Sequence, residues 1–202
     1  MASADRLVWI DLEMTGLDPK FDEIVEIACI VTDGELNELD EGISMVVKPG
    51  DESFAGMDDF VVNMHTVSGL IEEIPHGIAL ADAEQQVLAY IRTHVPEARK
   101  APLAGSSVYV DRGFLAAYMP ELDAHMHYRL VDVSSVKELT RRWYPRVYFQ
   151  LPKKEGGHRA LADILESIQE LRYYRQTVMV ASPGPSTDEA KAAAEIVKPT
   201  SN

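Results

Sequence analysis

The hydrophobic positions at the start of the chain follow the pattern of β-strands. Residues 7–10 form an apolar run of strand length, and residues 23–32 and 42–48 are rich in Ile, Val and Met. The pair Asp33-Gly34, between the second and third runs, is typical of a tight turn. The pattern therefore predicts three consecutive strands that pair as an antiparallel meander.

From residue 79 onward the hydrophobic positions follow the period of helices. Residues 79–95 carry apolar side chains on one helical face, and Pro96 ends this segment. The same pattern predicts helices over 107–118, 134–143 and 159–174, with short strands over 102–106 and 128–133. We expect short helices and loops over 50–78 and a loop over 144–157. Strands and helices that alternate after an antiparallel start predict an α/β fold, with a mixed sheet flanked by helices.

The segment 181–202 differs in composition from the rest of the chain. Its residues are small and polar, it contains three prolines, and it has few large apolar side chains. Such a segment buries too little apolar surface to fold alone. We therefore expect one domain over residues 1–180, followed by a disordered or loosely docked tail over 181–202, in which the alanine run favours at most a transient helix.

Charge and cysteine content limit the classes of function. The chain has 202 residues, with 19 basic and 33 acidic side chains and a net charge of −14. This balance argues against wrapping of long duplex nucleic acid, because basic residues supply that affinity. The single cysteine, Cys29, lies in an apolar strand, so we expect a buried thiol and no internal disulfide. With no signal peptide or spanning apolar run in the sequence, we expect a cytoplasmic protein.

Two acidic residues follow the first apolar run. Asp11 and Glu13 are separated by Leu12, and side chains alternate between the faces of a strand. The two carboxylates therefore point the same way, with backbones about 6.6 Å apart. A divalent cation with a preference for oxygen ligands, such as Mg²⁺ or Mn²⁺, would relieve their repulsion. The alternative is a strand end that frays into solvent and exposes both acids.

Further along the chain, Asp111 lies on an apolar helical stripe with Val108 and Leu115. An acid there needs a partner, such as a metal ion, because an unpaired buried charge is costly. Alternatively, Asp111 is the N-cap of a helix that begins one residue later. Taken singly, Asp163 lies off the core stripe of the last helix and His158 precedes that helix, as surface residues often do.

Together these elements resemble a known pattern. An Asp-x-Glu on the first strand, a later Asp that opens a helix, and His-x-x-x-x-Asp near the end are similar to the DEDDh exonuclease family. The resemblance to oligoribonucleases within that family covers roughly residues 5–180. It is carried by the segments IDLEMTGLDP, IVEIA, MDDF, HTVSGL, VDRGFL, YMPEL, HYRLVDVSSVKEL and RRWYP.

This resemblance implies a ribonuclease H-like fold and a homodimer that cleaves very short RNA from the 3′ end to 5′-mononucleotides, with dinucleotides as preferred substrates. It implies that two divalent ions, Mg²⁺ or Mn²⁺, are held by Asp11, Glu13, Asp111 and Asp163. His158 would then be the general base that takes a proton from the attacking water.

The resemblance also implies a set of substrate-binding residues. Leu17 would be a wedge between bases, Phe60 a stacking residue, and His65 would lie along the substrate. Four residues would close around the 5′ phosphate: Ser107, Arg129, Ser134 and Ser135. Tyr128 and Arg129 would reach across from the partner subunit. The chain departs from the family at Phe60, where tryptophan is common, and at Ser106, where asparagine is common.

Other interpretations remain open from the sequence. One is a proofreading or RNA-trimming exonuclease of the same superfamily that acts on long strands. Another is a nucleic-acid-binding module without catalysis, although all five catalytic positions are present. A separate metal site at His125 and His127 is a third, since His-x-His on a strand can point both imidazoles the same way, but no further ligand is evident.

Overall fold

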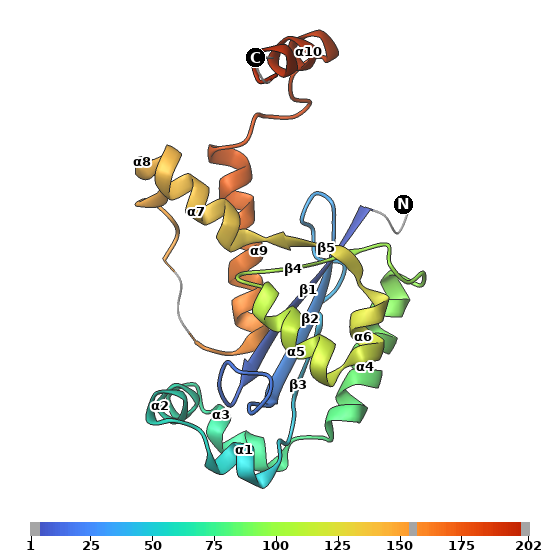
Figure 1. Ribbon diagram of the computed structural model, residues 1–202, viewed down its shortest axis with the longest axis vertical. Helices are drawn as coiled ribbons and strands as arrows, with labels where there is room; N and C mark the ends of the chain where they lie inside the picture. Colours follow the sequence, from blue (N-terminus) through green and yellow to red (C-terminus); the bar gives the residue numbers. More distant parts are fainter. Residues whose placement is uncertain (1–4, 154–156, 199–202) are drawn as a thin grey trace.

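A mixed sheet of five strands lies at the centre of the computed structural model, which describes residues 5–153 and 157–198 (Figure 1). β1 (Arg6–Met14) pairs antiparallel with β2 (Ile24–Asp33), and β2 pairs antiparallel with β3 (Ile43–Val46). β4 (Pro102–Gly105) pairs parallel with β1, and β5 (His127–Asp132) pairs parallel with β4. The strand order is β3-β2-β1-β4-β5. The predicted meander and the predicted mixed sheet are both confirmed.

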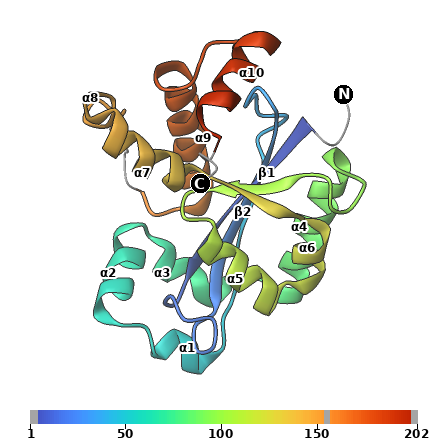
Figure 2. The same ribbon diagram turned by 45° about the horizontal axis from the view of Figure 1, so that its top comes forward.

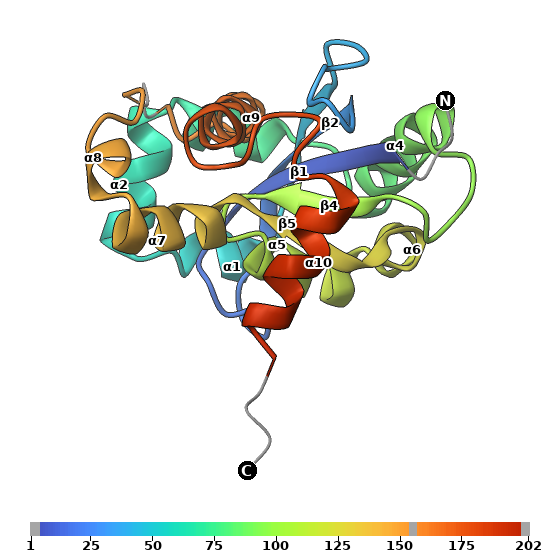
Figure 3. The same ribbon diagram turned by 90° about the horizontal axis from the view of Figure 1, so that it is seen from above.

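Helices cover both faces of this sheet, as Figures 1 and 2 show. One side carries α4 (Leu80–His94), α5 (Tyr109–Tyr118) and α6 (Pro120–His125), and the other carries α7 (Val133–Trp143) and α9 (Ala160–Thr177). Viewed from above, β1 and β4 run between α9 and α6 (Figure 3). The shorter helices are α1 (Asp51–Ala55), α2 (Asp59–Val67), α3 (Leu70–Glu73), a 3₁₀ turn (Ile74–His76), α8 (Pro145–Tyr148) and α10 (Thr187–Ile196).

The alternation of side chains along β1 divides the core into two clusters. Val8, Ile10 and Leu12 pack into the cluster that α4, α5 and α6 complete. Trp9 points the other way into the cluster formed with α9, and its indole Nε1 donates a hydrogen bond of 3.0 Å to Thr32. Because side chains pack against both faces of β1, the positions of its last residues are fixed.

The helix over residues 134–143 is confirmed, and only part of its apolar face is buried. Thr140 is buried, whereas Leu139 and Trp143 are 44% and 65% exposed. The predicted loop over 144–157 contains the short helix α8, and its residues 154–156 lie outside the described residues.

The segment after residue 180 contains more regular structure than expected. α10 begins at a capping box in which Ser186 and Glu189 exchange hydrogen bonds. The described part of the segment after residue 180 is therefore not wholly disordered. No residue of α10 is buried, and in Figure 1 the helix projects away from the sheet. Residues 199–202 lie outside the described residues. The division into a domain over 1–180 and a tail over 181–202 stays a prediction.

Cys29 behaves as expected, being free and fully buried in β2. Burial raises the pKa of its thiol well above the usual value, which keeps it neutral. Within the described ranges, each helix is too short or too polar to cross a membrane.

Glu84 generates a testable prediction about stability. This buried carboxylate of α4 accepts hydrogen bonds from the backbone N–H groups of Glu121 (2.8 Å) and Leu122 (3.1 Å), at the start of α6. Replacing Glu84 by Ala leaves these donors without their acceptor, so the free energy of unfolding should fall by about 1–3 kcal/mol. Urea denaturation measures this change. The Glu84→Gln variant keeps an oxygen acceptor and should lose less; equal losses would contradict the capping role.

Candidate active site

The first part of the site is the end of β1, where the strand continues through both acids to Met14. Leu12 is 5% exposed and packs into the core, while Asp11 and Glu13 project from the opposite face, toward α9. The strand therefore does not fray at this point, and Glu13 is itself only 7% exposed. In the pairing of β1 with β2, Glu13 stands opposite Glu26. The two acids are held by sheet geometry and not by a flexible loop.

Asp111 joins them from the first turn of α5. Its carboxylate Oδ1 accepts a hydrogen bond of 3.0 Å from the backbone N–H of Leu12, between the two acids of β1. The alternative of an N-cap is wrong, because α5 begins at Tyr109 and Val108 occupies the N-cap position. The side chain is 6% exposed, so its position on an apolar stripe does bury a carboxylate.

The start of α9 contributes the remaining predicted residues. Glu13, His158 and Asp163 each offer one ligand atom, and these atoms lie within 4.8 Å of one another. Asp163 is in the first turn of α9 and is half-buried, although the periodicity of the helix alone favoured a solvated acid. His158 is exposed at the mouth of the helix, with a backbone φ of 44°.

The crowding of carboxylates changes their acidity. Burial first, and then the charges of Asp111 and Asp163, raise the pKa of Asp11 well above its usual value. Burial and the charges of Asp163, Glu26 and Asp111 raise the pKa of Glu13 to about 8, against a smaller opposing effect of Arg159.

Burial also raises the pKa of Asp111 to about 7, although backbone N–H groups partly offset the rise. A site with this much unfavourable negative charge fits divalent cations, which oxygen ligands bind well. Asp11, Glu13, Asp111 and Asp163 are the residues that would hold them.

Beside Glu13 lies an apolar hollow of about 430 Å³. It is lined by Leu12, Glu13, Met14, Gly16, Leu17, Asp58, Phe60, Val61 and Met64. The side chains of Leu17 and Phe60 are 76% and 75% exposed, which is unusual for large apolar groups. Phe60 therefore belongs to this surface and not to a core stripe of α2. The two positions that resemble base-contacting residues thus lie in one hollow, next to a predicted metal ligand.

His65 lies differently from the expectation. Its side chain is fully buried beneath Glu13, with Nε2 donating to the carbonyl oxygen of Met14 at 2.9 Å. Its Nδ1 lies 3.9 Å from Oε2 of Glu13. In this structure the His65 side chain contacts the end of β1 from within the protein. A direct contact of His65 with substrate stays a prediction.

The three serines expected around a 5′ phosphate lie just after the carboxyl ends of β4 and β5. The hydroxyl of Ser107 donates to that of Ser134 at 3.1 Å, and Ser135 is exposed beside them. Asp132 accepts from the backbone N–H groups of Ser107 (3.0 Å) and Ser134 (2.9 Å), which joins the two segments. Ser106, at the position that departs from the family, instead contacts Ser167 of α9 at 3.0 Å.

Tyr128 and Arg129 project from β5, the strand at one edge of the sheet. Both side chains are exposed, and the guanidinium of Arg129 lies over the Tyr128 ring, 5.5 Å from its centroid. They are not brought to Glu13 within the part of one chain that the structure describes.

The proposed metal site at His125 and His127 is not supported. His125 ends α6, is buried, and contacts the carbonyl oxygen of Val95 at 2.9 Å. His127 begins β5, and its Nδ1 accepts from the backbone N–H of Arg129 at 3.1 Å. The two residues do not share a strand, so the alternation that motivated the pair does not apply.

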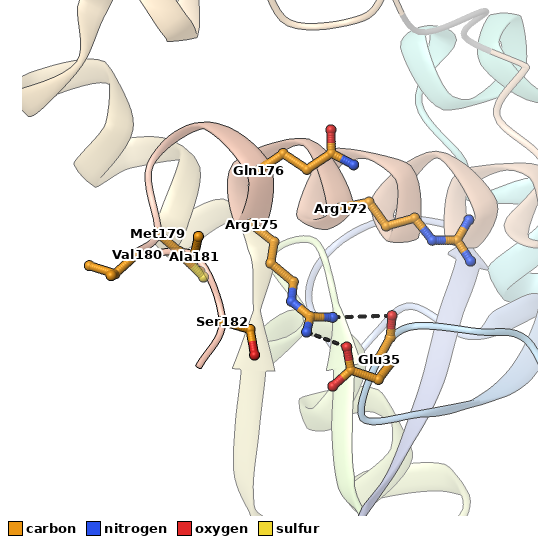
Figure 4. A pocket seen from close by; sticks show the side chains of 8 residues that line it. All are labelled: Glu35, Arg172, Arg175, Gln176, Met179, Val180, Ala181 and Ser182. Atoms are coloured by element: carbon orange, nitrogen blue, oxygen red, sulfur yellow. Dashed lines mark hydrogen bonds and ion pairs between the residues drawn. The ribbon is translucent and has the colours of Figure 1, made fainter. Parts of the chain in front are cut away.

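Another hollow, of about 520 Å³, lies where α9 meets the tail (Figure 4). Its Arg175 forms an ion pair with Glu35, as Figure 4 shows, and Arg172 pairs with Glu38 at 2.9 Å. None of the predicted site residues lines it. The predicted site residues therefore gather at the end of β1 and not at this hollow.

Sequence reasoning missed several residues that support the site. Glu26 and Glu73 both bind Arg159 at the start of α9, and Asp132 joins the serine segments. Asp132 has a signal in the sequence, since an Asp before a helix at the end of a strand is a common N-cap. The partners of Arg159 have none, because they are 133 and 86 residues away along the chain.

Comparison with known sequences gives an independent result. Residues 8–171 match the family described as Exonuclease. An oligoribonuclease from Leifsonia xyli is 60% identical over 195 residues, covering 96% of this chain and 94% of that protein. An oligoribonuclease from Streptomyces griseus is 59% identical, covering 93% of each chain, and one from Rhodococcus jostii is 57% identical, covering 96% and 98%.

Solved structures show the same fold. Exonuclease I from Methylocaldum szegediense superposes with a TM-score of 0.63 at 21% identity, covering 86% of this chain and 41% of that one. A zinc-bound complex of E. coli ExoI with single-stranded DNA gives 0.64 at 17% identity, again covering 86% and 41%. The chain thus spans less than half the length of these proteins. The expected fold class is confirmed.

The raised pKa of Glu13 predicts a pH-dependent loss of stability in metal-free protein. Between about pH 5 and pH 8 the folded state keeps a proton on Glu13 that the unfolded chain releases, so stability falls as the pH rises. Gln cannot ionise. Stability of the Glu13→Gln variant relative to wild type should therefore increase over this range, by on the order of 3 kcal/mol.

Thermal or urea unfolding in the presence of a chelator measures the difference. Added Mg²⁺ at pH 8 should stabilise wild type more than the variant, because the ion replaces the missing positive charge. Parallel pH curves for the two proteins would show that Glu13 is not buried among other carboxylates as described.

Proposed function

The chain belongs to the oligoribonuclease family of exonucleases, and we propose that its catalytic centre lies at the end of β1. It is a 3′-to-5′ exoribonuclease that hydrolyses short oligoribonucleotides to 5′-mononucleotides, with dinucleotides as the preferred final substrates. The main support for this location of the catalytic centre is the proximity of Glu13, His158 and Asp163, whose ligand atoms lie within 4.8 Å of one another.

Asp11, Glu13, Asp111 and Asp163 would hold two divalent ions, Mg²⁺ or Mn²⁺. When bound, the two ions would lower the pKa of the attacking water and support the negative charge on the departing 3′ oxygen. The raised pKa values of Glu13 and Asp111 support this assignment, because the positive charge nearby does not offset the burial of these carboxylates. Neutralisation of the acids also lets an anionic substrate approach.

His158 takes the proton of the attacking water at an imidazole nitrogen, as general base. The water oxygen bonds to phosphorus, the bond from phosphorus to the 3′ oxygen breaks, and a 5′-mononucleotide leaves. The exposure of His158 beside Glu13 and Asp163 supports this role, since water reaches the imidazole directly.

The bases of a short substrate would enter the hollow between Leu17 and Phe60. An aromatic face stacks on any base, so phenylalanine in place of tryptophan keeps the interaction and its tolerance of sequence. Exposed apolar surface next to the catalytic carboxylates supports this placement. His65 would hold Glu13 and reach the substrate only after a shift.

The 5′ phosphate of a dinucleotide would bind at Ser107, Ser134 and Ser135, with Tyr128 and Arg129 supplied by the partner subunit of a homodimer. The linked hydroxyls of Ser107 and Ser134 support the first part. The exposure of Tyr128 and Arg129 on an edge strand supports the second, because both side chains are accessible to a partner chain. A cytoplasmic location is part of the same proposal, and the free, buried Cys29 is consistent with a reducing compartment.

Replacement of His158 by Ala separates catalysis from binding. The variant should still bind Mn²⁺ and a dinucleotide but turn over about 10²–10⁴-fold more slowly, which is the usual contribution of a general base. Calorimetric titration measures binding, and mononucleotide release measures turnover. His76, an exposed histidine of the 3₁₀ turn, offers a matched His→Ala control that should keep normal turnover. If His158→Ala failed to bind the dinucleotide, His158 would be a binding residue.

Length selectivity tests the substrate class and the dimer together. RNAs of two to about twenty nucleotides are compared, and a 5′-phosphorylated dinucleotide should be cleaved most efficiently because a guanidinium bonds most fully to a terminal phosphate. Arg129→Ala should flatten the preference, whereas Arg92→Ala, at another exposed arginine, should not.

Mixed dimers test the sharing of Arg129. Chains that carry His158→Ala with an intact Arg129 are combined with chains that carry Arg129→Ala with an intact His158. Recovery of the length preference is expected. Equal cleavage of a twenty-nucleotide strand and the dinucleotide by wild type would instead favour a long-strand exonuclease.

A further inference from the structure

Arg159 joins three separate parts of the fold. It directly follows His158 and is the N-cap residue of α9. Its guanidinium lies 3.0 Å from Oε1 of Glu26 on β2, and it forms a bidentate pair with Glu73 of α3 at 2.9 and 3.0 Å. A planar guanidinium with two carboxylate partners is held in one orientation. The start of α9 is thereby tied both to the sheet and to α3, the helix that follows α2 and its Phe60.

Glu26 is the buried end of this connection. It stands opposite Glu13 in the strand register, yet its oxygens are used elsewhere: they accept from Arg159 Nε at 3.1 Å and from the backbone N–H of Ala160 at 3.1 Å. A carboxylate at this position favours the start of a helix. Glu26 is 1% exposed. This buried acid, although it lies beside Glu13, is therefore bonded to the start of α9.

The backbone of His158 needs such support. Its φ of 44° lies in the left-handed region, which costs energy for a residue with a side chain and persists only where neighbours hold it. The next residue is the one that Glu26 and Glu73 hold. In the first turn of α9, the N–H of Asp163 donates to the carbonyl oxygen of Arg159 at 3.0 Å. His158 therefore directly precedes the ion-paired Arg159, and Asp163 lies one helical turn after it.

We propose that Glu26, Arg159 and Glu73 form a clamp that positions His158 and Asp163 against Glu13. The three are positioning residues, and the clamp rests on the proposed function. Its loss moves the general base and one metal ligand, while the hollow at Leu17 and Phe60 keeps its own walls. The clamp therefore controls turnover and metal affinity more than the KM for a dinucleotide.

The test compares Arg159→Ala, Arg159→Lys and Glu73→Gln with a matched control on the same helix. Arg172 of α9 pairs with Glu38 at 2.9 Å, away from the site and with an exposure similar to that of the Arg159–Glu73 pair, so Arg172→Ala removes one comparable ion pair from the same helix. Arg159→Ala should lower kcat by about 10–100-fold with KM changed less than about 2-fold, since small displacements of catalytic groups are costly. Arg159→Lys keeps the charge without the planar fork and should recover part of the rate.

Calorimetric titration with Mn²⁺ alone gives a readout that does not depend on turnover. Arg159→Ala should bind Mn²⁺ about 10-fold more weakly, and Arg172→Ala should bind it normally. If Arg159→Ala does not fold, Arg159→Lys and Glu73→Gln, which retain a cation or an uncharged acceptor, carry the test.

The outcomes separate the clamp from the proposed function. Normal kcat and normal Mn²⁺ affinity in the Arg159 variants, or equal losses in Arg172→Ala, would reduce the clamp to an ordinary stabilising ion pair. A wild type that releases no mononucleotides would overturn the proposed function, and the Mn²⁺ titrations would still decide whether Arg159 positions the carboxylate site.

Discussion

Repulsion between carboxylates at the end of β1 is the constraint on which the rest of the site depends. Asp11, Glu13 and Asp111 are brought together in a place that water reaches poorly, and each has a raised pKa as a result. An isolated strand end would relieve the strain by fraying. Here Val8 and Ile10 pack into the core on one face of the strand and Trp9 does so on the other, so β1 cannot move to separate the acids. The apolar core holds the acids at positions that their mutual repulsion disfavours, and divalent cations bound as proposed would offset that repulsion.

The residues of the site differ in structural setting according to the role proposed for each. Groups that hold charge are on regular elements: β1 supplies two acids, α5 supplies Asp111 through a hydrogen bond to β1, and the first turn of α9 supplies Asp163. Leu17 and Phe60, which are proposed to contact a substrate of variable sequence, are exposed. The division is physical, because metal ligands tolerate little displacement, whereas stacking on a base tolerates much more.

Periodicity predicted the parts of this arrangement that are local. Alternation on β1 placed Asp11 and Glu13 on one face, and the apolar stripe of 79–95 identified α4. The same reasoning could not place Asp163. Its position on the helix is that of a solvated acid, and only the packing of β1 beside α9 makes it half-buried. Order and spacing of the acids, read as a resemblance, supplied what periodicity lacked.

Long-range polar pairs were beyond both kinds of reasoning. Glu26 reads in the sequence as a polar interruption of an apolar strand, and nothing local shows that Arg159, 133 residues later, neutralises it. The tail is a related case: its composition indicated a segment without a core, which the exposure of α10 agrees with, yet a capping box still forms a regular helix there. Local hydrogen bonds define such a helix, whereas only burial would attach it to the domain.

The acidic balance of the chain also bears on the size of its substrate. A protein that holds a long polyanion gains affinity from many basic side chains, each of which displaces counterions. In this chain several arginines are already engaged with carboxylates, including Arg112, Arg141, Arg159, Arg172 and Arg175. Under the proposed function, affinity would therefore come from contacts concentrated at one place: cations between the acids, apolar surface for a base, and hydroxyls for a phosphate. A dinucleotide presents all of its groups to such a place, whereas each further nucleotide adds charge that meets an acidic surface.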